Sequence, residues 1–233
     1  MLPGNSQILT CPFCGKEKEI MSLMSGNSRG LKQWSDNKQI APMLPEISYV
    51  QKCPHCEKYY IKDRQPERYA DEGCSFEQGL LTFPEMKEAF AQLAEEGFQD
   101  DKEESAVRMM LHHAYNDYYY RSGDNKDILE EDKTLFRDNA LWLINNLIYD
   151  DVMKAEFYRE IGDFDTARSI LDAVVFEEKV TQPPKTYYDE NLGEEVTEIP
   201  IDDEGDDDFL QQIASAIRQR VESSDCAVFM FEF

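Results

Sequence analysis

The sequence Cys11-Pro12-Phe13-Cys14-Gly15 is matched about forty residues later by Cys53-Pro54-His55-Cys56. Two Cys-x-x-Cys pairs at this separation are the ligand pattern of a zinc ribbon, in which two tight turns face each other across one tetrahedral ion. Two intervening residues let both sulfurs of a pair point into one turn, and a proline sets φ there. The sequence therefore predicts one structural zinc ion, bound by Cys11, Cys14, Cys53 and Cys56.

The residue after each pair differs between the two motifs. Gly15 takes positive φ without cost, whereas Glu57 stands at the matching place and is expected to adopt that conformation at some strain. Four thiolates with no further ligand make a closed, structural site rather than a catalytic one with an open position. The alternative is one or two redox-active dithiols, which the same motifs permit.

Length and composition bound the class of protein. The chain has 233 residues, of which 41% are hydrophobic, enough for one sizeable domain or a small domain beside a larger one. Its first residues lack the basic and apolar segments of a signal peptide, and no apolar run is long enough to span a membrane. Six cysteines, four of them in metal-type pairs, fit a reducing compartment, so we expect a cytoplasmic protein. Cys74 and Cys226 are expected to be small, buried or half-buried residues, and their reactivity is left open.

Charge is distributed unevenly along the chain. Residues 1–70 carry a formal +3 and residues 71–233 carry −27, which gives the net charge of −24. Phosphate binding needs clustered Lys and Arg, which the sequence lacks, and the field of the acidic part repels polyanions. We therefore expect no nucleic acid and no membrane among its partners. The charge favours a basic protein or peptide as partner, and the alternative is that it only keeps the protein soluble.

Apolar periodicity predicts a mainly helical chain with a small β component. Strands are expected at 47–52 and 57–61 around the second cysteine pair, with turns at 26–30 and 35–38 between the pairs. Helices are expected over 84–97, 102–121, 129–147, 152–161, 167–174 and 209–221. On the second of these helices, the expected apolar face is Ala106, Met109, Met110, His113, Ala114, Tyr118 and Tyr119. Further expectations are a hairpin across 186–199, a solvated acidic linker at 202–208, and an apolar segment, 227–231, packed on the body.

The clearest helical pair lies at 152–174. Val152, Ala155, Tyr158 and Ile161 line one helix, Gly162 ends it, and Asp163 or Asp165 can cap the next. The small Ala155 and Ala167 allow the two helices to approach closely. This pattern is typical of one tetratricopeptide unit, and since such units bury their faces by stacking, the preceding helices must supply the second layer.

Several stretches resemble a family of uncharacterised bacterial proteins. They are Trp34-Ser-Asp-Asn-Lys38, Ala41-Pro-Met-Leu-Pro45, Lys52-Cys-Pro-His-Cys-Glu-Lys-Tyr-Tyr60, Asn116-Asp117, Arg121 and Ala155-Glu-Phe-Tyr-Arg-Glu-Ile-Gly162. The resemblance implies a four-cysteine zinc-ribbon module followed by tetratricopeptide-like helices. It implies no activity, because none is established for that family.

No pattern of residues in the sequence indicates a catalytic site. His55 lies inside the second cysteine motif, and His112 and His113 lack the i, i+4 spacing and neighbouring Glu of a helical zinc-protease site. Neither a phosphate-binding glycine loop nor a nucleophile elbow is present.

The resulting hypothesis has three segments: a zinc-ribbon-like module at 1–64, a tetratricopeptide-like helical domain at 65–182, and an acidic hairpin and linker with a helix and tail at 183–233. We expect a non-enzymatic protein-interaction scaffold with one structural zinc. The alternatives are a redox or metal-responsive protein that uses its Cys-x-x-Cys pairs, and an enzyme whose site is not visible in sequence.

Overall fold

The computed structural model describes residues 1–124, 126–176, 185–189, 194–198 and 206–231. Its helices are α1 (Phe83–Glu96), α2 (Asp101–Asn116), α3 (Glu130–Asn146), α4 (Asp151–Glu160), α5 (Phe164–Ala173) and α6 (Asp206–Glu222), with a 3₁₀ turn η1 (Lys62–Arg64) and a π-helical turn η2 (Asp117–Arg121). The strands of the N-terminal part are β1 (Leu2–Pro3), β2 (Gln7–Thr10), β3 (Glu17–Ile20), β4 (Leu23–Ser25), β5 (Lys32–Gln33), β6 (Gln39–Ile40), β7 (Val50–Lys52) and β8 (Tyr59–Ile61). The chain is therefore mainly helical with small β-hairpins, as the sequence predicted.

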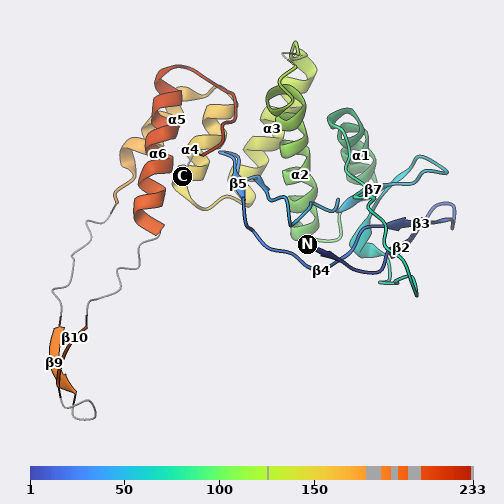
Figure 1. Ribbon diagram of the computed structural model, residues 1–233. Helices are drawn as coiled ribbons and strands as arrows, with labels where there is room; N and C mark the ends of the chain where they lie inside the picture. The colour runs from blue at the N-terminus through green and yellow to red at the C-terminus, as the bar shows by residue number, and fades with distance from the viewer. Residues whose placement is uncertain (125, 177–184, 190–193, 199–205, 232–233) are drawn as a thin grey trace.

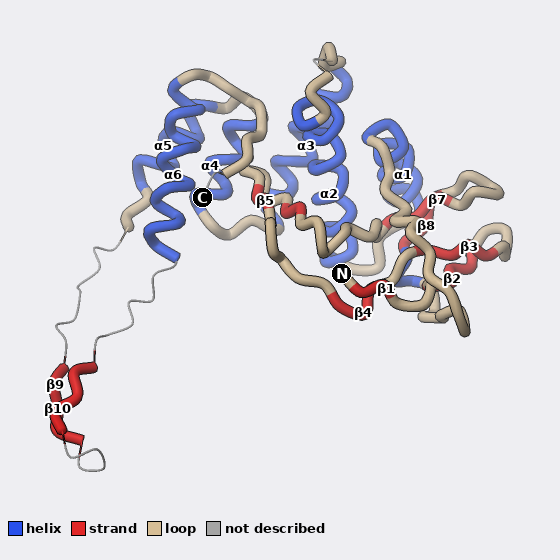
Figure 2. The backbone as a smooth tube through the Cα atoms, in the orientation of Figure 1, coloured by secondary structure: helices blue, strands red, loops and turns tan. Residues whose placement is uncertain are grey.

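The N-terminal strands form separate two-stranded antiparallel pairs (Figure 2). Hairpin β2–β3 encloses the first cysteine motif and β7–β8 encloses the second. The predicted strands at 47–52 and 57–61 are present but shorter. The sequence analysis did not anticipate the strands around the first motif or the pairs β1–β4 and β5–β6, whose two- to four-residue length carries little periodicity.

The second cysteine hairpin packs against the first helices. Val50, Tyr59 and Ile61 share one buried apolar cluster with residues of α1 and α2. The Gln92 side chain of α1 accepts a hydrogen bond from the Tyr59 amide (3.1 Å) and donates one to the Tyr59 carbonyl (2.8 Å). It therefore satisfies the strand edge as a further strand would. The four-cysteine part is thus built onto the helical body.

Helix boundaries follow their capping residues. Thr82 and Glu85 form a capping box at the start of α1, Asp150 caps α4 by accepting from the Met153 amide, and Asp163 caps α5 by accepting from the Thr166 amide. Of the two caps proposed for α5, Asp163 is therefore correct. Gly97, the C-cap of α1, has φ of +89°, a backbone conformation that glycine adopts readily.

The predicted face of α2 is wrong by about one residue position. The buried residues of the helix are Glu103, Val107, Leu111, His112, Tyr115 and Asn116, followed by Tyr119 in η2, whereas the other residues of the predicted face are half-buried. Three of these buried side chains are polar, so a search for apolar periodicity rotates the helix away from its true inner face.

Helices α4, α5 and α6 share a second apolar cluster, which contains the fully buried Ala155 and Ala167. Figure 1 shows these three helices together at one end of the molecule, beside α3. The paired helices α4 and α5 agree with the sequence analysis. Stacking of the tetratricopeptide type is not shown by these contacts and stays a prediction.

The segment after α6 returns to the N-terminal part. The Phe229 carbonyl accepts a hydrogen bond from the Ser35 amide (2.8 Å), and the Phe231 amide donates to the Gln33 carbonyl (2.9 Å). Val228 and Phe229 are buried. Residues 225–231, here called the C-terminal strap, thereby hold β5 and the Trp34 turn against α4, which confirms that the apolar 227–231 segment packs on the body.

Beyond this body lies one further antiparallel pair, β9 (Lys185–Asp189) with β10 (Glu194–Glu198), which confirms the hairpin predicted across 186–199. Within the predicted acidic linker, residues 202–205 lie outside the described residues, whereas Asp206 already begins α6. None of the described helices has the length and apolarity needed to cross a membrane.

Candidate functional site

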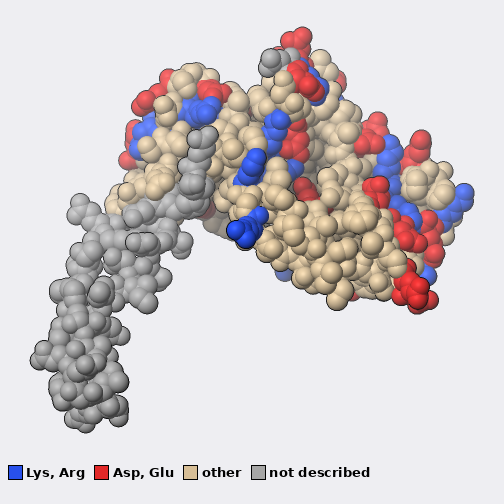
Figure 3. Space-filling model, in the orientation of Figure 1, with Lys and Arg blue, Asp and Glu red and all other residues tan. Residues whose placement is uncertain are grey.

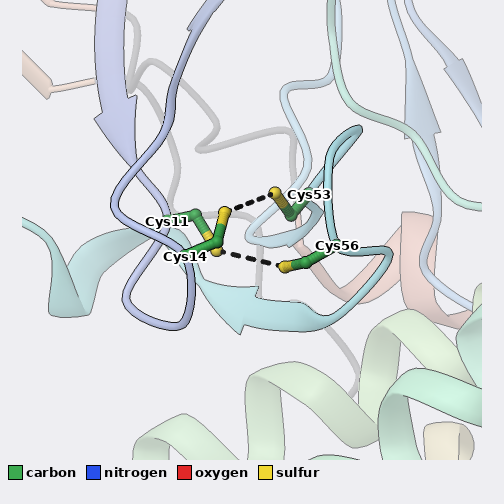
Figure 4. Close-up of side chains that lie close together, drawn as sticks. All are labelled: Cys11, Cys14, Cys53 and Cys56. Carbon is green, nitrogen blue, oxygen red and sulfur yellow. Dashed lines mark hydrogen bonds between the residues drawn. The ribbon is translucent and has the colours of Figure 1, made fainter.

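The four predicted ligands converge. Cys11, Cys14, Cys53 and Cys56 place their sulfurs within 4.8 Å of one another, the one group of three or more potential metal ligands found among the described residues. Contacts between the two motifs join Cys11 to Cys56 and Cys14 to Cys53, each with 3.6 Å between the sulfurs (Figure 4). The cluster could hold a metal ion.

The two cysteine turns have the same backbone construction. In each, the amide of the first cysteine donates to the carbonyl five residues later: Cys11 to Lys16 (2.8 Å) and Cys53 to Lys58 (2.9 Å). The residue after the second cysteine has positive φ in both, +70° at Gly15 and +60° at Glu57. The strain expected at Glu57 is therefore present, and the motif keeps its shape despite the glutamate.

The second turn favours a thiolate at Cys53, whereas burial and the neighbouring cysteines raise the pKa of the Cys14 and Cys56 thiols. The His55 amide lies 3.4 Å from the Cys53 sulfur and donates to it. Burial raises the pKa of the Cys53 thiol, but the amide hydrogen bonds of Cys56 and His55 outweigh burial and lower it to about 7. The His55 ring is exposed, so this histidine contributes its backbone, rather than its imidazole, to the cluster.

A group of charged and polar side chains lies buried in the interior, where the sequence analysis proposed no site. This buried polar cluster consists of Asp36, His112, Asn116, Arg121 and Glu160. The Asn116 amide group donates to Asp36 and to Glu160, both at 2.9 Å, and His112 Nε2 lies 2.9 Å from the same Glu160 oxygen. Arg121 pairs with Asp36. The cluster therefore joins the turn after β5 to α2, η2 and α4.

Aromatic rings enclose the histidine of this cluster. His112 is fully buried and stacks on Phe157 at 4.3 Å and on Phe136 at 4.6 Å between ring centroids. The π-helical turn η2 directly follows Asn116 and carries Arg121 to Asp36. Such insertions into a helix frequently occur at functional sites.

Ionisation differs among members of the cluster. Burial raises the pKa of Glu160 to about 8, with the nearby Asp36 carboxylate adding to the effect. Burial lowers the pKa of His112 to about 4. For Asp36, burial acts in the same direction as for Glu160, but His113 and Arg121 outweigh it and lower the pKa to about 2. At neutral pH the cluster thus holds an ionised Asp36–Arg121 pair beside a neutral Glu160 and a neutral His112.

The cluster also concentrates unpaired polar atoms. Within the described residues, six buried side-chain nitrogen or oxygen atoms make no hydrogen bond. Four of these belong to cluster members, namely His112 Nδ1, Asn116 Oδ1, Arg121 Nε and Glu160 Oε1, and a fifth is Nε1 of Trp34, whose ring lies 4.9 Å from the Arg121 guanidinium. Buried polar atoms are rarely left unpaired, so this is where ordered water or a ligand is expected.

The sequence analysis missed this cluster because its members were assigned to turns and to ordinary helix surface. One indication was available: Asp36, Asn116, Arg121 and Glu160 all fall in the stretches that carry the family resemblance. The helix α4 offered another, because Glu156, Arg159 and Glu160 share its buried side with Val152 and Ala155.

Comparison with known proteins adds no relative. The sequence matches no family model and no curated protein, and the structure matches no solved structure. The findings therefore define a mainly helical chain with a four-cysteine cluster of the metal-binding type near its N-terminus.

Proposed function

We propose that the four cysteines bind one zinc ion whose role is structural. Tetrahedral coordination with Zn–S bonds of ~2.3 Å places sulfurs ~3.8 Å apart, a spacing close to the 3.6 Å contacts of this cluster. All four positions are supplied by thiolates, so no position remains for a substrate. When bound, the ion would cross-link two hairpins whose shared apolar cluster is small and includes two of the ligands, Cys11 and Cys53.

The alternative is redox cycling of the two Cys-x-x-Cys pairs. Its products would be disulfides within each motif, between Cys11 and Cys14 or between Cys53 and Cys56. Sulfur contacts of 3.6 Å join opposite motifs, and all four sulfurs lie within 4.8 Å of one another. This convergence of both motifs supports one shared ion over two separate dithiols, and it is the observation on which the proposal depends.

Zinc content and thiol reactivity test this proposal. We expect one zinc per chain and four thiols that react only after chelation. Cys14→Ser should lower zinc occupancy and expose residues 8–62 to protease, because three ligands hold the ion less firmly.

Cys74→Ser is the matched control, because Cys74 lies outside the cluster and is exposed. The expectation that Cys74 is buried or half-buried is therefore wrong, whereas Cys226 is half-buried as expected. A wild-type protein that keeps its protease resistance without metal would contradict a structural role. Ready formation of a disulfide within a motif would favour the redox alternative.

We further propose that the helical body is a non-enzymatic scaffold for a basic protein or peptide. Two adjoining hollows, of about 530 Å³ and about 500 Å³, share Tyr149, Asp151 and Ala173 between the end of α3 and the α4–α5 pair. The Tyr149 side chain is 85% exposed and Val175 is 87% exposed, which is unusual for such apolar surface. The net charge of −24 supports a cationic partner.

Charge on the visible face agrees with this choice. In Figure 3, acidic side chains lie over the helix ends and the cysteine hairpins, and Lys and Arg are interspersed among them rather than gathered into one basic surface. A phosphate backbone binds through clustered cations. This supports a protein partner over a nucleic acid.

A pair of synthetic helical peptides tests the scaffold role. A Lys/Leu amphipathic peptide should bind, and its affinity should fall as the salt concentration rises. It should bind at least ~10-fold less tightly to Tyr149→Ala. A peptide of the same length with Glu in place of Lys should not bind. Phe76→Ala removes another exposed aromatic, 66% exposed and remote in sequence, and should leave binding unchanged. Equal binding of both peptides, or no effect of Tyr149→Ala, would contradict the assignment of this groove.

A further inference from the structure

A pocket of about 430 Å³ lies next to the buried polar cluster and shares no lining residue with the scaffold groove. Its lining comes from the end of α2 and η2, the start of α3, the end of α4 and the C-terminal strap. The lining includes three aromatic residues, one cation, one buried carboxyl group and one thiol: Tyr115, Tyr120, Phe136, Arg137, Glu160 and Cys226. We call it the tyrosine pocket. Its volume is in the range of small-molecule sites.

One wall of the pocket is aromatic, and the charged side chains of the pocket, Glu130, Lys133 and Arg137, come from α3. Tyr115 stacks on Phe136 with ring centroids 3.9 Å apart, and Tyr120 stands 6.2 Å from Tyr115. Burial raises the pKa of both phenols, that of Tyr120 to about 12, so neither is ionised at neutral pH. A planar, apolar body fits against such an aromatic wall, since aromatic rings also pack edge to face.

The interior end of the pocket contains a hydrogen-bonding group with an unused atom. Glu160 is fixed through its Oε2 atom, which Asn116 and His112 hold at 2.9 Å. Its Oε1 atom is buried and has no partner in the part of the chain that the structure describes. Because burial keeps this carboxyl protonated, the group can donate a hydrogen bond as well as accept one. A hydroxyl group on a ligand satisfies either arrangement.

The rim of the pocket carries an unpaired cation. Lys133 is paired with Glu130 at 2.6 Å, whereas Arg137, one turn further along α3, is exposed and makes no hydrogen bond or ion pair with any described residue. A guanidinium group presents two parallel N–H donors that match a carboxylate. The rim therefore favours an anion even though the protein as a whole is acidic.

We propose that the tyrosine pocket binds a small aromatic carboxylate with a ring hydroxyl, its ring against Tyr120 and the stacked Tyr115–Phe136 pair, its carboxylate on Arg137 and its hydroxyl on Glu160. This site is separate from the cysteine cluster and from the groove at Tyr149. In this arrangement the buried polar cluster positions Glu160 for the ligand. His112 and Asn116 contact Glu160 directly, and Asp36 and Arg121 hold Asn116 in turn.

Cys226 provides a reporter within the pocket. Its thiol is half-buried and lines the cavity, whereas Cys74 is exposed and does not. We would alkylate the full-length, zinc-loaded protein with iodoacetamide and measure each cysteine by mass spectrometry, with 4-hydroxybenzoate, phenol or benzylamine present. Ligand-observed NMR would give the affinities.

Occupancy should protect Cys226 and leave Cys74 unchanged. We expect 4-hydroxybenzoate to bind about tenfold more tightly than phenol and benzylamine to bind least, because only the first compound uses both ends of the pocket. Arg137→Gln should weaken 4-hydroxybenzoate about tenfold and leave phenol unchanged. Arg168→Gln, which alters an exposed arginine of α5, is the control.

Thr134→Trp blocks the pocket without touching its interior, since Thr134 is an exposed α3 residue on the lining. It should abolish binding of all three compounds while the circular dichroism spectrum is kept. The proposal is overturned if 4-hydroxybenzoate neither protects Cys226 nor binds by NMR, if benzylamine binds more tightly, or if Thr134→Trp leaves binding intact.

Discussion

Glu57 adopts a backbone conformation that its residue type disfavours. Its φ of +60° matches the +70° of Gly15 at the equivalent place in the other cysteine turn. A left-handed conformation costs a residue with a β-carbon roughly 1–2 kcal/mol, and glycine avoids this cost. The two turns are thus a natural comparison of one backbone with two residue types.

Exchanging the two residue types should change stability in opposite directions. Glu57→Gly should stabilise the zinc-loaded protein by about 0.5–1 kcal/mol, because relief of strain exceeds the added freedom of the unfolded chain. Gly15→Ala should destabilise it by roughly 1–2 kcal/mol through the backbone alone, since nothing lies within 4 Å of an added β-carbon. Urea unfolding at saturating zinc measures both. Glu57→Ala, which keeps the strain, should be close to wild type, and a gain there would assign the effect to charge instead.

Glu160 should make stability depend on pH. Its carboxyl has a pKa near 4.3 when unfolded and about 8 in the folded protein. The unfolded chain therefore releases a proton that the folded chain retains. The contribution of this group is complete below pH ~4.3 and declines as pH rises toward about 8, by at most ~1.4 kcal/mol per pH unit.

The variant Glu160→Gln removes this decline because its amide does not titrate. Its free energy of unfolding should rise relative to that of wild type as pH increases from about 5 to about 8. Urea unfolding of both proteins at several pH values measures this difference. Any constant cost of the amide cancels in that slope. If the free energy of unfolding of wild type instead rises relative to that of the variant as pH increases, Glu160 is ionised in the folded state. The proton assignment of the cluster is then wrong.

Residue types alone were enough to find the four cysteines, because a metal site needs those atoms at that spacing. They were not enough to find Asp36, Asn116 or Glu160. Polar residues are mostly exposed in folded proteins, so a single sequence gives no reason to place three of them inside. Only the fold shows that turn, helix and π-helical turn meet at one point.

The helices were predictable from caps and breakers, whereas their orientation was not. Gly97 ends the first helix where the sequence placed its end, and Asp163 is one of the two caps that the sequence offered for α5. The face of α2 was misassigned because His112 and Asn116 occupy its buried side. Apolar periodicity locates a helix reliably, but it orients one only when the buried side is apolar.

Helices α4 and α5 offer a test of close packing at the level of elements. Ala155 is fully buried, with 0% of its surface accessible to solvent, and it shares an apolar cluster with Ala167. Ala155→Leu should overpack this contact and lower the free energy of unfolding by roughly 1–3 kcal/mol. Thermal and urea unfolding measure the change. Ala173→Leu, at an exposed position of α5, should have little effect. A neutral Ala155→Leu would show that the helices do not need this close approach.

At the scale of the whole molecule, the C-terminal strap connects parts that are distant in sequence. Arg159 of α4 is fully buried, forms an ion pair with Glu156 at 2.5 Å, and donates to the Ala227 carbonyl at 3.1 Å. Phe229 lies under two guanidinium groups, those of Arg159 and Arg220. The strap therefore supplies hydrogen-bond acceptors and aromatic surface to cations that the interior would otherwise leave poorly satisfied.

Removing the anchor of this strap should loosen both of its partners. Phe229→Ala should cost about 3 kcal/mol of stability, the lower end of the range for a core phenylalanine, because the side chain is at the edge of its cluster. Limited proteolysis should then cut near residues 32–40 as well as near 225–231. Val175→Ala, which changes an 87% exposed side chain, should do neither. Unchanged protection of the 32–40 region would mean that the strap is not what holds the Trp34 turn.

The strap also bears on how the chain can fold as it is made. Residues 225–231 leave the ribosome after every segment they bind, including β5, the Trp34 turn and α4. Until they emerge, Arg159 lacks its carbonyl acceptors and the Gln33 backbone lacks its added strand. The contacts of the strap are therefore the last of these contacts to form. A nascent chain of this protein therefore presents incomplete edges for most of its synthesis, the stage at which chaperones bind.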